Sequence, residues 1–116
     1  MFVYIIKVSG LSLFKVGYTN DVARRQSELQ TGNPFSIEPY AILGCESVEQ
    51  AREVESHLQQ AMGGKTRAGG KEWHMVEPNH IRVILFEAMT KHNENMNWKL
   101  KWVLQPNLDP IESNMI

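Results

Sequence analysis

The chain has 116 residues, a formal net charge of −1, 42% hydrophobic residues and 22% charged ones. This length fits one domain with its own core, and the near-neutral charge argues against a protein that holds nucleic acid by bulk electrostatics alone. A single cysteine, Cys45, excludes an internal disulfide and a cysteine-based zinc cluster. No apolar run approaches the roughly 20 residues needed to span a bilayer, and no signal-peptide pattern is visible, so we expect a cytoplasmic protein.

The N-terminal segment has the pattern of a hairpin that leads into a helix. Residues 2–8 and 12–18 are apolar and β-branched runs on either side of a Ser-Gly-Leu turn, which predicts two paired strands. Asn20 or Asp21 can cap a following helix that reaches about Gln30. A hairpin that delivers polar side chains to the start of an arginine-bearing helix can hold a phosphate.

The middle of the chain predicts a third strand and a second helix. Residues 34–45 contain enough apolar positions for a strand, and Pro39 indicates that this strand lies at an edge or begins late. Ser47 and Gln50 form a capping box for a helix expected to reach Met62.

Residues 63–70 form a glycine-rich basic segment that is predicted to be a flexible loop. It lacks the spacing of a phosphate-binding P-loop and follows a helix instead of a strand, so we reject that interpretation. A short strand is predicted over residues 71–76, and a third helix is predicted to begin at Pro78 and to reach about Lys91. The apolar face of this helix is expected to contain Ile81, Ile84, Leu85 and Ala88.

We expect the chain to divide into a domain over residues 1–91 and a C-terminal extension over residues 92–116. Apolar and polar residues alternate over 98–104, as in a half-buried strand, and the end of the extension is expected to be loose. Trp98 and Trp102 could stack on unpaired bases, but we expect them to pack on the core or on a second subunit.

Two charged residues fall on apolar helical stripes. At about 100° per residue, Arg25 lies on the stripe of the first helix and Glu55 on that of the second. A charge in such a position is costly unless it is paired or bound. One explanation is an Arg25–Glu55 salt bridge; the other is a phosphate bound by Arg25 and a divalent metal bound by Glu55.

With these two residues in place, the sequence resembles the GIY-YIG nuclease family over residues 2–85. Val3-Tyr4-Ile5 stands where the Gly-Ile-Tyr motif is expected, with Tyr4 matching its tyrosine, and Lys15-Val16-Gly17 stands where Tyr-Ile-Gly is expected. Arg25 falls on the family's arginine and Glu55 on its metal-binding glutamate.

Further matches resemble a phage and bacterial subgroup of that family. They are Lys15-Val-Gly-Tyr-Thr19, Leu29-Gln-Thr-Gly-Asn-Pro34, Ala51-Arg-Glu-Val-Glu55 and Gly70-Lys-Glu-Trp73. Lys15 replaces the second motif tyrosine, as it does in this subgroup. Leu29 and Gln59 stand where histidines are often found, and Asn79 is a weak match to the family's late asparagine.

The resemblance implies an α+β fold, with a three-stranded, mostly antiparallel sheet flanked by helices, and the C-terminal extension added to it. It also implies an endonuclease that hydrolyses DNA by a one-metal mechanism. Glu55 would bind Mg²⁺ or Mn²⁺, Arg25 would stabilise charge on the phosphate, and Tyr4 would orient or deprotonate the attacking water. Lys15 would contact the phosphate or act on Tyr4 through its charge.

Other residues are expected to contact the nucleic acid around these four. They are Tyr18, Arg24, Lys65, Arg67 and Lys71. The basic loop suits contacts to backbone phosphates without base reading, although a solvated surface loop has the same composition. The partners expected are DNA, single- or double-stranded, and a second copy of the chain through the C-terminal extension.

A different class of function also fits the sequence. A module that keeps the fold but has lost efficient catalysis would bind nucleic acid or a protein partner, for example as a phage-encoded inhibitor acting in the host cell. The missing histidine and asparagine favour this alternative, and the retention of Tyr4, Arg25 and Glu55 opposes it.

Overall fold

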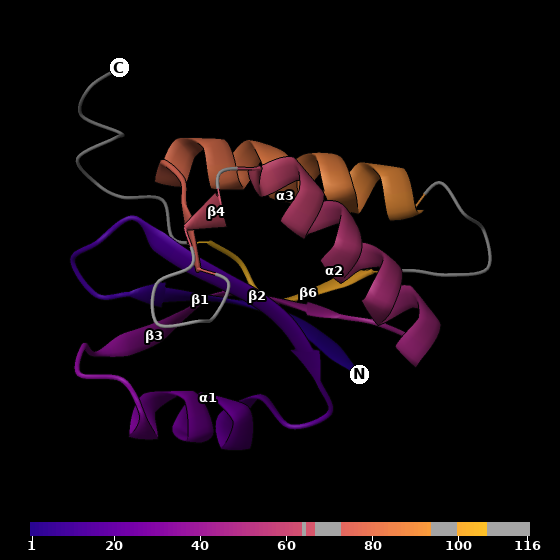
Figure 1. The fold of residues 1–116 in the computed structure, drawn as a ribbon. Coiled ribbons are helices and arrows are strands. Elements are labelled where there is room, and N and C mark those ends of the chain that lie inside the picture. Colours follow the sequence, from indigo (N-terminus) through magenta and orange to yellow (C-terminus); the bar gives the residue numbers. More distant parts are fainter. Residues whose placement is uncertain (64, 67–72, 94–99, 107–116) are drawn as a thin grey trace.

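The computed structural model describes residues 1–63, 65–66, 73–93 and 100–106 (Figure 1). Its strands are β1 (Phe2–Val8), β2 (Leu13–Thr19), β3 (Ile37–Gly44), β4 (Lys65–Thr66), β5 (Trp73–Met75) and β6 (Lys101–Leu104). Its helices are α1 (Val22–Thr31), α2 (Val48–Met62) and α3 (Pro78–Asn93). None of the helices in these ranges is long and apolar enough to cross a membrane.

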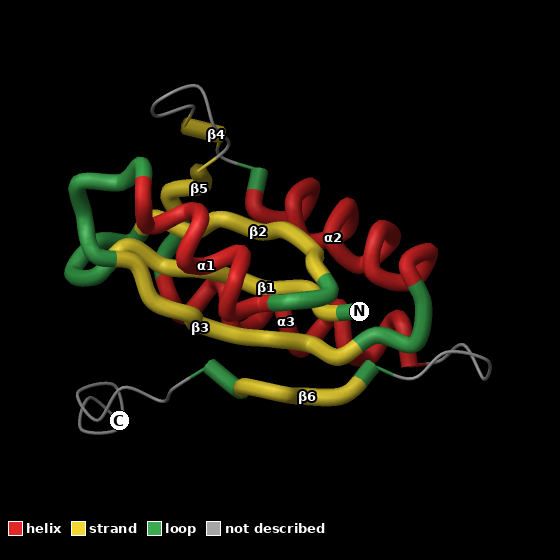
Figure 2. The backbone as a smooth tube through the Cα atoms, turned by 90° about the horizontal axis from the view of Figure 1, so that it is seen from below, coloured by secondary structure: helices red, strands yellow, loops and turns green. Residues whose placement is uncertain are grey.

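The described strands form one antiparallel sheet in the order β4-β5-β2-β1-β3-β6. Helix α1 covers one face of this sheet, whereas α2 and α3 cover the other, as the two perpendicular views show (Figures 1 and 2). The α+β class is therefore confirmed. The central strands β2, β1 and β3 are the three strands of the predicted sheet.

The prediction of a three-stranded sheet is wrong, because short strands extend the sheet at both edges. Two of these, β5 and β6, lie within the segments 71–76 and 98–104 that the sequence predicts to be strands. Strand β5 pairs with β2, and β4 pairs with β5. The two residues of β4 lie in the segment 63–70, which the sequence predicts to be a loop. On the other edge β6 pairs with β3. The strand predicted over 98–104 is observed at Lys101–Leu104, and residues 98 and 99 lie outside the described part. The domain boundary at residue 91 stays a prediction.

The β1–β2 hairpin turns at Gly10, whose φ of +79° is a conformation that favours glycine. Both following helices begin at the predicted caps. Asp21 accepts a hydrogen bond from the backbone N–H of Arg24, and Ser47 accepts one from that of Gln50 at 3.0 Å. The Gln50 side chain in turn accepts a bond from the backbone N–H of Glu46, which fixes the entry to α2.

Two groups of buried side chains hold the layers together. The α2/α3 core consists of the residues Val3, Ile5, Phe14, Val16, Ala41, Leu43, Ala51, Val54, Leu58, Met62, Val76, Ile81, Ile84, Leu85, Ala88 and Leu100. The α1 cluster, on the opposite face, consists of Tyr4, Ile6, Val8, Leu29, Ile37 and Trp73. The apolar face predicted for α3 is confirmed, and Trp73 is also buried.

Pro39 lies where its missing N–H does least harm. Strand β3 pairs with β1 along its length, but its described pairing with β6 covers only Ile42–Gly44. Pro39 therefore has no strand partner on that side among the described residues. Strand β3 is not an edge strand, because it lies between β1 and β6, and it begins before Pro39, at Ile37. The register between β1 and β3 shifts next to Pro39, between Ile5 and Ile6.

Candidate active site

Tyr4 is the buried centre of the candidate site. It lies on β1 directly opposite Gly17 of β2, and only 2% of it is exposed. A Cβ atom at Gly17 would overlap the Tyr4 hydroxyl. The glycine therefore leaves the space in which the phenol ring rests against the β2 backbone, which gives the motif glycine a physical reason.

Arg25 reaches this tyrosine from the first turn of α1. Its Nε donates a hydrogen bond to the Tyr4 hydroxyl at 3.4 Å, and its Nη1 lies 3.4 Å from the carboxylate of Glu28. The hydrogen bond with Tyr4 is the main cause that raises the pKa of Arg25 above its ordinary value. With 43% of its side chain exposed, Arg25 is a permanent cation at the surface. In the described structure its ion pair is with Glu28 and not with Glu55, the alternative left open by the sequence.

Lys15 faces the same side of the sheet as Tyr4. It stands opposite Ile6 of β1, two residues along β2 from Gly17, and residues directly opposite each other in a ladder share a face. Since Ile6 belongs to the α1 cluster, Lys15 points to the α1 side and is partly buried there.

Glu55 belongs to the opposite side of the sheet, on the partly buried flank of α2. One of its oxygens accepts a hydrogen bond from Nε2 of Gln59 at 3.2 Å. The four predicted residues thus come from both faces of the sheet: Tyr4, Lys15 and Arg25 from the α1 side and Glu55 from the α2 side.

The donor at Glu55 fits a hard divalent cation, because carboxylate oxygen is a preferred ligand of Mg²⁺ and Mn²⁺. Among the described residues, no group of three or more histidine, cysteine, aspartate or glutamate side chains could hold a metal together. A cation at Glu55 would therefore take most other ligands from water and substrate, as Mg²⁺ commonly does.

The segment Leu29–Pro34 fixes the position of α1. Leu29 is the buried residue of the helix and packs in the α1 cluster. The Gln30 side chain donates to the carbonyl of Phe35 at 3.0 Å and accepts from the N–H of Ile37 at 2.9 Å. These bonds tie the end of α1 to the start of β3, so the motif has a structural role that supports the placement of Arg25.

The residues predicted to contact nucleic acid are placed unequally. Tyr18 points to the α2 side, and its hydroxyl accepts a hydrogen bond from Nε of Arg52 at 3.1 Å. Arg24 is exposed on α1, beside Arg25. Lys65 lies in β4, where the backbone alone is described, whereas Arg67 and Lys71 lie outside the described residues.

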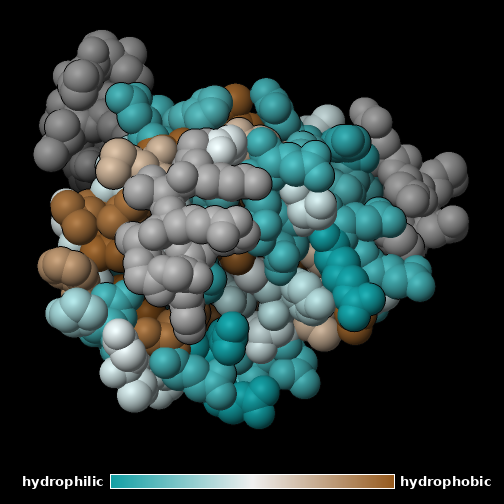
Figure 3. All heavy atoms as spheres, viewed as in Figure 1, coloured by the Kyte–Doolittle hydropathy of each residue, from teal (hydrophilic) through white to brown (hydrophobic). Residues whose placement is uncertain are grey.

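Arg52 was not predicted from the sequence. It stands three residues before Glu55, and residues at this spacing are neighbours on a helix surface. That spacing is the signal that could have identified it. Hydrophilic residues predominate over the exposed sides of α2 and α1, which flank the end of β2 (Figure 3).

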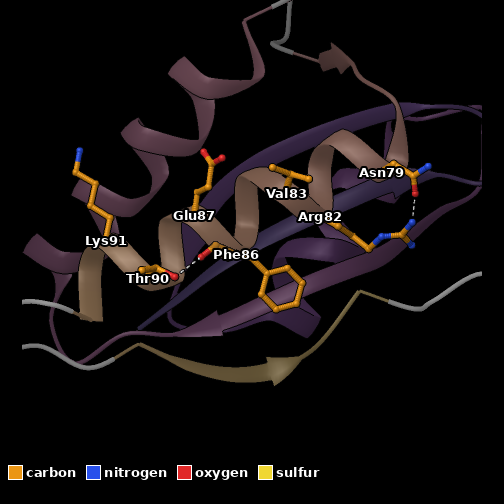
Figure 4. A pocket seen from close by; sticks show the side chains of 7 residues that line it. All are labelled: Asn79, Arg82, Val83, Phe86, Glu87, Thr90 and Lys91. Carbon is orange, nitrogen blue, oxygen red and sulfur yellow. Dashed lines mark hydrogen bonds between the residues drawn. The ribbon is translucent and has the colours of Figure 1, made fainter.

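A groove of about 850 Å³ lies along the outer side of α3 (Figure 4). Its described lining is Asn79, Arg82, Val83, Phe86, Glu87, Thr90 and Lys91. None of these residues touches the Tyr4–Arg25 pair, and Asn79, the weak match to the family asparagine, bonds to Arg82 there. Phe86 also stacks edge-to-face with Trp102 of β6, which packs against the α2/α3 core. The groove is therefore separate from the candidate active site.

The fold and the residues around β2 are compatible with a small nuclease-like domain. The T5orf172 domain matches residues 1–89. The chain therefore belongs to the T5orf172 domain family, which is associated with nucleases. No curated protein and no solved structure matches the chain significantly.

Proposed function

We propose that the protein is a metal-dependent endonuclease of the GIY-YIG type that hydrolyses phosphodiester bonds in DNA. The observation that carries the proposal is the Tyr4–Arg25 hydrogen bond. It joins a buried tyrosine of the first strand to a half-exposed arginine of the first helix, and the T5orf172 match covers both. A glycine that makes room for this tyrosine supports the same conclusion.

Arg25 binds the scissile phosphate with its guanidinium. The fork geometry of arginine suits two phosphoryl oxygens, and its charge stabilises the negative charge that develops on them. Tyr4 is only 2% exposed, and its hydroxyl is bonded to Arg25. When Arg25 turns toward the phosphate, this hydroxyl becomes accessible and orients the attacking water. The water oxygen forms the new bond to phosphorus, the bond to the leaving sugar oxygen breaks, and the protons of the consumed water end on the two products.

Glu55 would hold Mg²⁺ or Mn²⁺ through its carboxylate, and a cation bound there would supply positive charge that neutralises the phosphate and the leaving oxygen. Lys15, on the same side as Tyr4, adds a second positive charge near the phosphate. The outer contacts to the DNA backbone come from Arg24 and from the basic residues Lys65, Arg67 and Lys71, which carry no base specificity by themselves.

The test is cleavage of labelled single-stranded, duplex and branched DNA, and of RNA, with Mg²⁺, with Mn²⁺ and with EDTA. Glu55→Gln keeps the shape of the side chain but removes the charge that binds a cation, so we expect loss of at least about 100-fold in rate. Glu53→Gln is the matched control, because Glu53 is an exposed glutamate of the same helix, and it should cleave like the wild type.

Two outcomes would overturn the proposal. One is wild-type protein that leaves every substrate intact with either metal, and the other is cleavage that Glu55→Gln does not reduce. Tight binding of DNA without cleavage would favour the alternative of an inactive binding module.

A further inference from the structure

A second tyrosine–arginine pair lies on the opposite side of the sheet from Tyr4 and Arg25. Tyr18 follows Gly17 in β2, and its hydroxyl accepts a hydrogen bond from Nε of Arg52 at 3.1 Å. This bond is the main cause that raises the pKa of Arg52 above its ordinary value. Arg52 is exposed on α2, so it carries a permanent charge at the surface.

The two pairs flank the same end of β2. In the β1–β2 ladder, Tyr4 is opposite Gly17 and Val3 is opposite Tyr18, so the two tyrosines are held at adjacent rungs with their rings on opposite faces. The described pairing of β5 with β2 stops at Phe14. The edge of β2 at Gly17 and Tyr18 therefore lies beyond that pairing, with one arginine above it and one below.

Both arginines are held in the same way. Each uses its Nε to bond a tyrosine hydroxyl, and Nη1 of Arg25 also pairs with Glu28. The terminal nitrogens of Arg52 form no hydrogen bond to a residue in the described ranges. Fixing an arginine side chain costs conformational entropy, and the tyrosine bond meets part of that cost before any ligand binds.

We infer that Arg52 forms a second phosphate-binding position, which takes another phosphate of the strand bound by Arg25. The inference rests on the proposed function, because it requires a nucleic acid strand that crosses the end of β2 beyond its described pairing with β5. Glu55 lies one helical turn from Arg52 on the same side of α2. The strand would thus run from Arg25 on the α1 side, past Glu55, to Arg52 on the α2 side. Tyr18 is a positioning residue in this arrangement and not a direct contact.

The experiment measures binding without cleavage. Fluorescence anisotropy of a short labelled DNA single strand and duplex is recorded in EDTA over a series of salt concentrations. Arg52→Ala should weaken binding roughly tenfold and lower the slope of log K against log salt by about one, as the loss of one phosphate contact does. Arg82→Ala is the matched control, because Arg82 is an arginine on the outer side of α3, and it should leave both quantities unchanged.

Tyr18→Phe separates positioning from charge. The variant keeps the charge of Arg52 but removes the acceptor that holds it, so affinity should fall a few-fold while the salt slope stays that of the wild type. Arg52→Lys should behave similarly, because lysine keeps the charge and lacks the fork. A purely structural role of Tyr18 would not separate affinity from slope in this way.

An unchanged affinity and slope in Arg52→Ala would overturn the inference, and so would a wild-type protein that binds neither probe. The result is distinguishable from failure of the proposed function. A protein that binds DNA, loses one unit of slope in Arg52→Ala and cleaves nothing would refute the nuclease and keep the second phosphate position. A protein that cleaves DNA and ignores Arg52→Ala would do the reverse.

Discussion

The two faces of the sheet carry similar tyrosine–arginine pairs, but the hydrophobic clusters on the two faces differ greatly in size. The α2/α3 core contains sixteen of the described buried hydrophobic residues, whereas the α1 cluster contains six. Helix α1 itself buries only Leu29, but α2 buries five residues, Gln50, Ala51, Val54, Leu58 and Met62. Folding stability therefore comes mostly from one face, and Arg25 lies on the helix with the weaker attachment.

The largest expected effect tests this division directly. Leu58→Ala removes a fully buried side chain from the α2/α3 core and should lower the free energy of unfolding by about 2–5 kcal/mol. Leu29→Ala, in the smaller and less enclosed cluster, should cost about 2 kcal/mol, at the lower end of the range for such truncations. Urea titration of both variants gives the comparison. Equal losses would show that α1 is attached as firmly as α2.

Next in size is the cost of filling the space at Gly17. Gly17→Ala puts a methyl group against the Tyr4 hydroxyl, and overpacking of this kind costs about 1–3 kcal/mol. Gly32→Ala is the control, since a Cβ there meets no atom within 4 Å. Adding Tyr4→Phe to Gly17→Ala should recover part of the stability because it removes the overlapping oxygen.

The double variant also tests the site. Cleavage should stay low in Gly17→Ala with Tyr4→Phe even where stability recovers, because the hydroxyl assigned to the attacking water is gone. Full recovery of cleavage would contradict the role proposed for Tyr4.

The sequence predicts the local parts of this architecture well. The caps Asp21 and Ser47 and the buried face of α3 follow from patterns within a few residues, and the structure confirms them. Strand β6 also follows from the alternation over 98–104, but its pairing with the distant strand β3 does not. The two-residue strand β4 lies in a segment whose glycine-rich composition predicts a loop, so its pairing with β5 could not be predicted.

The candidate site was predictable in its members but not in its arrangement. Helical-wheel geometry selects Arg25 and Glu55, yet it cannot show that their helices lie on opposite faces of the sheet. It also places Arg25 on a core-facing stripe, whereas 43% of its side chain is exposed because the α1 stripe is narrow. The Tyr18–Arg52 bond joins residues far apart in sequence, so only the fold reveals it.

A smaller effect is expected from removing the N-terminal caps of α1 and α2, one on each face of the sheet. Asp21→Ala and Ser47→Ala each remove one bond to a backbone N–H and should each cost about 1 kcal/mol. We expect the two variants to lose protection from amide hydrogen exchange in different parts of the fold. In Asp21→Ala, amide hydrogen exchange should accelerate within α1 alone, because this helix can open without the core. In Ser47→Ala, protection should fall in α2 and in the strands packed on it. The same pattern in both variants would contradict a weaker attachment of α1.

The smallest effect concerns the access of solvent to the α2/α3 core at the connection between β3 and α2. Cys45 lies in this connection, packs against the α2/α3 core, and donates its backbone N–H to the carbonyl of Met1 at 2.8 Å. Burial raises the pKa of its thiol from 9.0 to about 11. Because only the thiolate reacts, a shift of this size should slow alkylation by iodoacetamide on the order of 100-fold at about pH 8, relative to the urea-unfolded chain.

The rate for the folded protein should rise about tenfold per pH unit until the pH approaches the pKa of Cys45. The raised pKa of Cys45 also makes the free energy of unfolding depend on pH. The neutral thiol is favoured in the folded state, so its contribution is complete below pH 9.0 and is lost as the pH rises toward 11. Fast alkylation of the folded protein at about pH 8 would mean that this end of the core admits solvent. The α2 side would then resemble the α1 side more closely than the burial pattern indicates.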